Sequence, residues 1–148
     1  MIIQLTQGKS MLIDDRDAHL FAAKWYFNGG YAKHCVSYGK ILYAHRVIMG
    51  ASPEQDVDHI NRDKLDNRRA NLRFATASQG NANRVNARNT SGYRGVRWHK
   101  GNGRWFAAIC VNRKHIHIGA FRDPRRAALA YDLAAYLHFG EFAQLNGV

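Results

Sequence analysis

The adjacent side chains of Asp58 and His59 are the pair in this chain best suited to chemistry. A carboxylate oxygen is a hard ligand that suits Mg²⁺ or Mn²⁺, and an imidazole can take a proton from water near neutral pH. An isolated pair of this kind is more often a helix cap beside a packed histidine. Here the pair is followed by a polar loop and by Asn71-Leu72-Arg73, and this context favours a catalytic interpretation.

Hydrophobic periodicity and turn residues predict the short elements that would position this pair. The elements expected in the first half are strands at 2–5, 11–13, 31–37, 41–45 and 57–60, a polar loop at 61–67, and helical segments at 17–25, 46–49, 69–72 and 76–84.

The second half is expected to hold three strands, at 93–98, 104–111 and 115–121, followed by one helix at 124–138. The helix has the clearest signals, because Asp123 is a good N-cap and Pro124 occupies the first helical position. Its alanine-rich face allows it to pack closely on a sheet. The sequence therefore predicts an α+β fold.

The chain is strongly basic, with 22 Lys and Arg against 11 Asp and Glu, a net charge of +11 and a pI near 10.1. This balance points to a polyanionic partner, and arginines interleaved with Tyr and Trp favour nucleic acid. No apolar run approaches the ~18 residues of a membrane span, and the N-terminus lacks the layout of a signal peptide. We therefore expect a cytoplasmic protein with no membrane partner and no organic cofactor. Cys35 and Cys110 are too few for a cysteine-dominated site, so no structural zinc is expected.

The charge is spread unevenly over two halves. Residues 1–84 carry 12 basic and 8 acidic side chains, a net charge of +4, whereas residues 85–148 carry 10 and 3, a net charge of +7. Between them, the segment 85–92 is short of large apolar residues and rich in Asn, Ser and Thr, which is typical of a linker. We predict two modules, at 1–84 and 93–146, joined by a linker at 85–92.

The first module resembles the HNH family of nucleases, in the variety found in phage and intron-encoded homing endonucleases. The resemblance runs from Tyr43-Ala-His45-Arg46 through Asp58-His-Ile-Asn, Leu65-Asp-Asn-Arg and Asn71-Leu-Arg to Arg84. It implies a ββα-metal fold with one divalent cation, Mg²⁺ or Mn²⁺. It also implies that His59 is the general base, that Asp58 ligates the metal and that Asn71 bridges and stiffens the loop.

One position departs from the family pattern. Four residues beyond Thr76 the family places Asn or His as the second protein ligand, and here that position is Gly80. Asn81, the next residue, and Asn83, on the same helical face as Gly80, are the alternatives for this ligand. Otherwise the site is weakened or inactive.

His45 and Arg46 precede the catalytic pair by a dozen residues. They have two interpretations of about equal weight. One is contact with a phosphate or positioning of the scissile strand. The other is a histidine satisfied at a strand–helix junction.

The second module resembles the AP2/ERF DNA-binding domain over nearly its full length. The motifs that carry the resemblance are Tyr93-Arg-Gly-Val-Arg, Gly103-Arg-Trp-Phe-Ala-Ala-Ile, Ile118-Gly-Ala-Phe, Ala127-Ala-Leu-Ala-Tyr-Asp-Leu-Ala-Ala and Gly140-Glu-Phe-Ala-Gln-Leu-Asn. The resemblance implies a three-stranded sheet in the DNA major groove with one helix behind it. The DNA-facing residues that it implies are Arg94, Arg97, His99, Arg104, His115 and His117, with Tyr131 contacting a phosphate from the helix.

Strand alternation would place such cations on one face of the sheet, and Arg113 adds a further donor. Two strands depart from the plant members. Ala108 and Cys110 stand where plant proteins have Glu and Arg, and His115 and His117 stand where they have Arg and Trp. The plant target sequence is therefore not carried over.

Together the modules predict a metal-dependent endonuclease that hydrolyses phosphodiester bonds of double-stranded DNA. We expect it to act as a monomer or weak dimer. We also expect it to be phage-encoded or to act in a bacterial host cell. The alternative is a non-catalytic DNA-binding or regulatory protein with a degenerate nuclease core.

Overall fold

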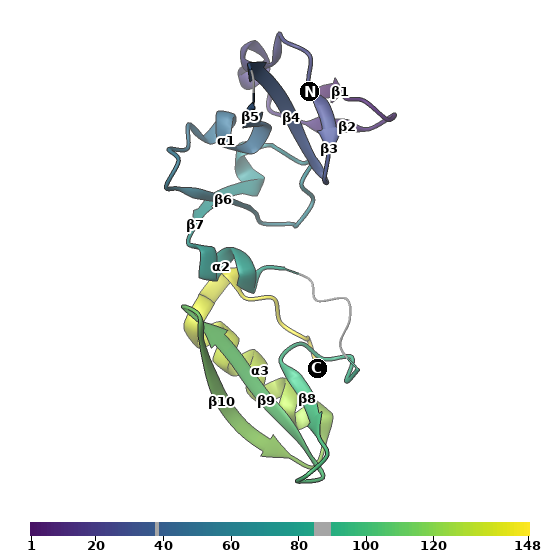
Figure 1. Cartoon of the computed structure of the whole chain (residues 1–148), viewed down its shortest axis with the longest axis vertical. Helices are drawn as coiled ribbons and strands as arrows, with labels where there is room; N and C mark the ends of the chain where they lie inside the picture. The colour runs from purple at the N-terminus through teal and green to yellow at the C-terminus, as the bar shows by residue number, and fades with distance from the viewer. Residues whose placement is uncertain (38, 85–89) are drawn as a thin grey trace. The chain divides into compact units, whose positions relative to one another are not determined.

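The computed structural model describes residues 1–37, 39–84 and 90–148, which form two compact units, Met1–Thr76 and Ala77–Val148 (Figure 1). Most of the predicted linker, residues 85–89, lies outside the described residues, so the predicted module bounds stay a prediction. The mixture of short strands and helices confirms the predicted α+β class.

The first unit begins with two small antiparallel sheets. β1 (Ile2–Gln4) pairs with β2 (Ser10–Leu12), and a 3-10 helix, η1 (Asp15–Phe21), follows in place of the helix expected at 17–25. A three-stranded sheet is then formed by β3 (Tyr26–Asn28), β4 (Tyr31–Ser37) and β5 (Lys40–Tyr43). The strands predicted at 31–37 and 41–45 are confirmed as β4 and β5, except that Ala44 and His45 belong to the helix that follows. β3 was not foreseen.

A helix and a two-stranded sheet complete this unit. α1 (Ala44–Met49) ends at Gly50, whose left-handed backbone conformation lets its N–H close the last turn. β6 (Asp56–His59) then pairs with β7 (Leu72–Ala75), which follows the 3-10 turn η2 (Arg69–Asn71). The expectation of a helix over 69–72 was therefore wrong in its last residue, because Leu72 pairs with His59 in the sheet.

One hydrophobic core holds these elements together. It draws side chains from the first hairpin, η1, α1 and β7, so that β6 and β7 are anchored to the rest of the unit through Leu72. The buried members are Leu5, Met11, Ile13, Phe21, Trp25, Ala32, Ala44, Ile48 and Leu72.

The second unit is a three-stranded antiparallel sheet packed against one long helix, as predicted (Figure 1). Its strands are β8 (Val96–His99), β9 (Arg104–Val111) and β10 (Lys114–Phe121), and its helix is α3 (Pro124–Phe139), followed by the 3-10 turn η3 (Gly140–Phe142). Asp123 caps α3 by accepting a hydrogen bond from the backbone N–H of Arg125 at 2.8 Å.

Small residues allow the helix to approach the sheet closely. Ala127 and Ala128 are fully buried against Val96 and Ala107. Before β8, Gly95 has a positive φ of 72°, and a Cβ there would collide with the ring of Tyr131. Only glycine meets both requirements, so Gly95 fixes how the start of the sheet meets α3.

The short helix α2 (Ala77–Ala82), which follows β7 in sequence, belongs to this second unit. It packs against α3 and η3, and Ala82 is buried with Ile109, Tyr131, Ala135 and Phe139. The helical prediction for 76–84 is thus confirmed over 77–82.

Candidate functional site

The candidate catalytic pair lies at the end of β6. Asp58 pairs across the sheet with Arg73 of β7, and His59 pairs with Leu72. His59 is 5% exposed and Asp58 is partly buried. The β6–β7 hairpin therefore holds both side chains on a paired, well-anchored backbone.

The tautomer of His59 is set by Asn67. The amide nitrogen of Asn67 donates to the carbonyl of Leu65 at 3.3 Å, so its oxygen Oδ1 faces Nε2 of His59 at 3.2 Å. Because Oδ1 can only accept, Nε2 must carry the ring proton and donate it. Nδ1 of neutral His59 then carries the lone pair, and this is the nitrogen that can take a proton.

Burial favours the neutral form of His59. Desolvation lowers the pKa of His59 from its ordinary value of 6.5, while the hydrogen bond that the ring donates to Asn67 and the nearby carboxylate of Asp58 act in the opposite direction. Neutral imidazole is the form that a general base requires.

His45 packs against the same ring. On α1 it is buried, with its ring centroid 5.0 Å from that of His59, and its neighbours include Tyr31 and Tyr43. Burial, with the nearby His59 and Arg46, lowers the pKa of His45 to about 3. This geometry favours the packed interpretation of His45 over direct contact with a phosphate.

Arg46 stabilises the loop that leads to β6. Its guanidinium donates to the carbonyls of Gln55 at 2.8 Å and Ser52 at 2.6 Å. The side chain thus spans the connection between α1 and β6.

Asp58, the expected metal ligand, forms an ion pair with Arg73. Its Oδ2 accepts hydrogen bonds from Nε and Nη2 of Arg73, both at 3.1 Å. Both side chains are largely buried, with 14% and 11% of their surfaces exposed. The carboxylate is therefore paired with a positive charge, so a cation at Oδ2 would compete with Arg73.

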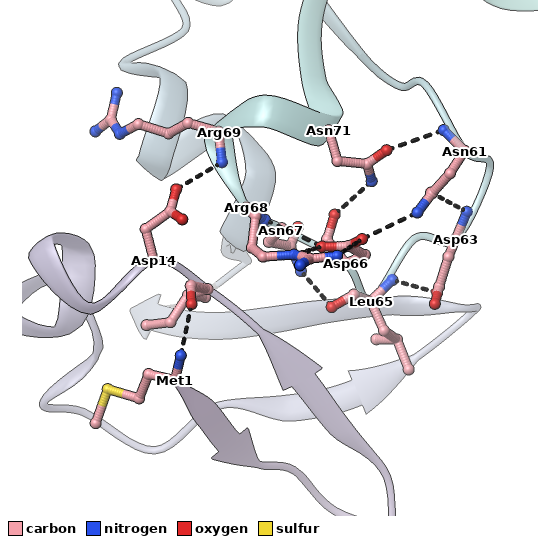
Figure 2. Close-up of polar contacts among 11 residues, drawn as sticks. Met1, Asp14, Asn61, Asp63, Leu65, Asp66, Asn67, Arg68, Arg69 and Asn71 are labelled. Atoms are coloured by element: carbon pink, nitrogen blue, oxygen red, sulfur yellow. Dashed lines mark hydrogen bonds and ion pairs between the residues drawn. The ribbon is translucent and has the colours of Figure 1, made fainter.

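A network of amides and carboxylates fixes the loop between β6 and β7 (Figure 2). Asn71 accepts from the N–H of Asn61 at 2.9 Å and donates to the carbonyl of Asp66 at 2.7 Å. Asn61 in turn donates to the carboxylate of Asp66 at 2.9 Å. Asn71 thus bridges the two ends of the loop, and the loop presents Asn67 to His59.

Two arginines that follow Asn67 anchor the loop through carboxylates. Arg68 donates to both oxygens of Asp66, and this hydrogen bonding lowers the pKa of Asp66. Arg69 binds both oxygens of the buried Asp17, which lowers the pKa of that carboxyl group. Its backbone N–H also donates to Asp14 at 2.9 Å (Figure 2).

Asn81 and Asn83, the residues expected to complete the metal site, lie with Gly80 on or directly after α2 in the second unit. Asn81 is exposed and Asn83 is buried. A Cβ added at Gly80 would meet nothing within 4 Å, and Gly80 has no positive φ. The backbone therefore accepts a side chain at the position where the family carries its ligand.

The strand register gathers five predicted DNA-facing residues on one face of the second sheet. Cross-strand pairs join His99 to Arg104, Arg97 to Phe106, His117 to Ala108 and His115 to Cys110. Side chains paired in this way project to the same side, and the alternate residues pack on α3. The residues that share this open face are Arg97, His99, Arg104, His115 and His117.

Aromatic rings add to this open face. The ring of His99 stacks on Phe106 with centroids 4.5 Å apart, and His117 lies 4.9 Å from Phe106. Arg113 is exposed in the tight turn between β9 and β10, where both it and Asn112 have positive φ.

Arg94 and Tyr131 have contacts within the unit. Nε of Arg94 donates to the hydroxyl of Tyr131 at 2.7 Å, and the guanidinium also donates to the carbonyls of Asn81 and Arg84. Tyr131 is buried. Sequence reasoning placed both residues against DNA and did not foresee these contacts.

Asn67 and Arg73 are the neighbours of the catalytic pair that sequence reasoning missed. Both lie inside the motifs that carried the family resemblance, Leu65-Asp-Asn-Arg and Asn71-Leu-Arg. Their place in these motifs was the signal that could have identified them as parts of the site.

Two features are absent from residues 1–37, 39–84 and 90–148. No group of three or more His, Cys, Asp or Glu side chains in these ranges is arranged to hold a metal ion. None of their helices is long and apolar enough to cross a membrane.

The order β6, β7, α2, with Asp58-His59 closing β6, is that of a ββα nuclease. Residues 42–82 match the model of the HNH endonuclease family. Most of the chain is similar to an uncharacterized HNH endonuclease of Acanthamoeba polyphaga mimivirus, 34% identical over 133 residues, which cover 84% of this chain and 67% of the viral protein. The chain belongs to the HNH endonuclease family.

A further part of the chain is similar to plant proteins. Ethylene-responsive transcription factor ERF024 of Arabidopsis thaliana is 45% identical over 56 residues, 36% of this chain and 30% of that protein. An AP2-like ethylene-responsive transcription factor of the same plant is 41% identical over 64 residues, 42% of this chain and 17% of its own length. The chain thus joins an HNH core to an AP2-like region.

Proposed function

We propose that this protein is a metal-dependent DNA endonuclease that its AP2-like sheet delivers to double-stranded DNA. The reaction is hydrolysis of a phosphodiester bond. Water attacks phosphorus, the bond to the 3′ oxygen breaks, and the products carry 5′-phosphate and 3′-hydroxyl ends. We further propose that it is a homing-type nuclease that is phage-encoded or acts in the cytoplasm of a bacterial host cell. The similarity to a viral protein supports only the viral part of this proposal.

The observation that carries this proposal is the state of His59. Its ring is buried, its pKa is lowered by desolvation, and Asn67 holds the proton on Nε2. Nδ1 is therefore the ring nitrogen that would accept the proton of the attacking water. Asn71 supports this arrangement by stiffening the loop that carries Asn67.

The donors available to a metal are hard oxygens, which suit Mg²⁺ or Mn²⁺. Asp58 would supply a carboxylate, and Asn81 or Asn83 would supply an amide oxygen in place of the residue missing at Gly80. Such an ion, when bound, would stabilise the charge on the phosphate and on the leaving oxygen. Arg73 orients the Asp58 carboxylate from the neighbouring strand.

The open sheet face supports binding to duplex DNA by a monomer or weak dimer. Arg97, Arg104 and Arg113 would contact phosphates or guanine edges, because guanidinium groups donate to both. The second half carries most of the excess charge, +7 of +11.

Cleavage of supercoiled plasmid by the full chain tests the proposal. We expect nicked or linear product with Mg²⁺ or Mn²⁺ and none with EDTA. Cleavage that persists in EDTA, or no cleavage with either ion, would contradict the proposed reaction.

Gly80 favours one second candidate, a DNA-binding regulator with a degenerate nuclease core. The position of the second ligand has no side chain, although the backbone leaves space for one. This candidate predicts binding to duplex DNA without cleavage under any of the metal conditions above.

A further inference from the structure

Helix α2 is too short to be stable by itself. It has six residues, including Gly80, whereas isolated helices become stable in water only at about 12–15 residues. Its conformation must therefore come from packing, and the packing that the structure describes lies within the second unit.

Contacts at both ends fix α2 to that unit. Near its start, the hydroxyl of Ser78 accepts a hydrogen bond from the N–H of Asn112 in the β9–β10 turn at 3.0 Å. At its end, the carbonyl of Ala82 accepts from the N–H of Gln144 at 3.2 Å, and the Ala82 methyl group is buried against Ile109 and Phe139.

Arg94 binds the C-terminal end of α2 directly. Its guanidinium donates to the carbonyls of Asn81 and Arg84, which are groups that a helix end leaves without partners in the helix. A positive charge at this end is also favoured by the helix dipole. The hydroxyl of the buried Tyr131 accepts from Nε and fixes the third side of the guanidinium.

The backbone of Arg94 is held as firmly as its side chain. Asn146 accepts from the N–H of Arg94 at 2.6 Å and donates to its carbonyl at 3.3 Å. Asn146 is itself bound to Asp132 of α3 through its side chain and its backbone. The AP2-like fold thus fixes the position of Arg94, and Arg94 in turn binds the end of α2.

We infer that Arg94 is a positioning residue that docks α2 on the AP2-like sheet and helix, so that this module builds part of the nuclease as well as binding DNA. The inference rests on the proposed function, because α2 carries the proposed ligand Asn81. Arg94 then acts on cleavage through α2, whereas a residue of the open face acts through affinity for DNA.

Amide hydrogen exchange on the full chain tests the docking without any need for activity. The amides of Asn112 and Gln144 are protected by α2 itself, and those of Asn83 and Arg84 report its last turn. In Arg94→Ala we expect these amides to exchange about tenfold faster or more, because charge-assisted hydrogen bonds are lost, with protection in α3 and β9 retained. Arg94→Lys should be intermediate.

The matched control is Arg126→Ala, which removes one charge from an exposed position on α3. The amides of this variant should exchange at the same rates as those of the unmodified protein. Equal protection of α2 in Arg94→Ala and in this control would overturn the inference. If Arg94→Ala also loses protection in α3, a second variant, Ala82→Asp, tests the docking. It disrupts the same contact by placing a charge on the buried side of α2. It must expose the amides of Asn112 and Gln144 while α3 stays protected, and failure to do so overturns the inference.

Single-turnover cleavage at saturating DNA gives the second readout. We expect Arg94→Ala to lower the rate by about tenfold or more, in step with release of α2, and Arg126→Ala to leave it unchanged. A rate unchanged in Arg94→Ala although α2 is released would overturn the link to cleavage. Absence of cleavage by the unmodified chain would refute the proposed function and, with it, that link, whereas hydrogen exchange would still decide the docking.

Discussion

Asp58 and Arg73 face each other across the β6–β7 hairpin, with Oδ2 of the carboxylate 3.1 Å from both Nε and Nη2 of the guanidinium. The proposed metal ligand is thus paired with a cation from its own sheet. Metal binding at Oδ2 must weaken this pair, and this competition is open to measurement.

Replacing Arg73 by Met should raise affinity for Mn²⁺, because the competing cation is removed while the unbranched apolar stem of the side chain is kept. The same change should lower the free energy of unfolding by about 1–3 kcal/mol, since Asp58 loses charge-assisted hydrogen bonds. Titration of Mn²⁺ and urea denaturation measure the two effects. Weaker Mn²⁺ binding in Arg73→Met would show that Arg73 supports the site and does not compete with it.

His45 should make the first unit sensitive to acid. Its pKa is about 3 in the folded chain and 6.5 ordinarily, so the unfolded chain binds more protons between these values and stability falls as the pH drops below 6.5. One such group contributes a slope of up to about 1.4 kcal/mol per pH unit. His59, whose pKa is also lowered, acts in the same direction.

Urea denaturation at several pH values from about 7.5 to 4.5 should show a smaller acid loss in His45→Phe than in the unmodified chain. Asp17 and Asp66 titrate below this window, because their pKa values lie under the ordinary 3.8. His138→Gln, at an exposed position, is the control. An equal acid loss in His45→Phe would refute the assignment to His45.

Gly80 is the position where an added side chain should restore a ligand. Gly80→Asn should raise metal affinity and the cleavage rate on the order of tenfold if the site is under-coordinated. Gly80→Ala controls for the gain in helix propensity, which both changes share in part. Loss of activity in Gly80→Asn alone would indicate that Asn81 or Asn83 already fills the role and is obstructed by the new side chain.

Arg97 is exposed on the open face of the second sheet, and its removal should weaken DNA binding. If it contacts a phosphate, Arg97→Ala should reduce the slope of log affinity against log salt by about 0.9 on every duplex. If it reads guanine, the cost should be about 1–3 kcal/mol on a preferred duplex only. Binding equal to that of Arg126→Ala at every salt concentration would exclude Arg97 from the interface.

The sequence predicted elements whose signals are local. α3 was foreseen almost residue for residue, because Asp123, Pro124 and the alanine pattern define it without help from distant parts of the chain. β3 and β7 were missed because they have three and four residues, and their strand character comes from partners elsewhere in the chain.

The sequence predicted the candidate site only in part, and for the same reason. Asp58 and His59 were found because their types and motif are specific, whereas Asn67 as the partner of His59 depends on how the loop folds back. Arg94 was placed against DNA because its motif is shared with AP2 proteins. Its contact with α2 depends on a helix outside that module's motif, so sequence alone could not show it.

The proposed reaction depends on neutral His59 taking the proton of the attacking water. The most direct test is the single-turnover rate of plasmid cleavage by His59→Ala at saturating DNA with Mg²⁺ or Mn²⁺, beside its affinity for DNA in EDTA. We predict a rate lower by roughly 10²–10⁴ with nearly unchanged affinity. In the unmodified chain the rate should fall only at a pH below 6.5, since the pKa of His59 is lowered. A His59→Ala protein that cleaves at the unmodified rate would contradict the account.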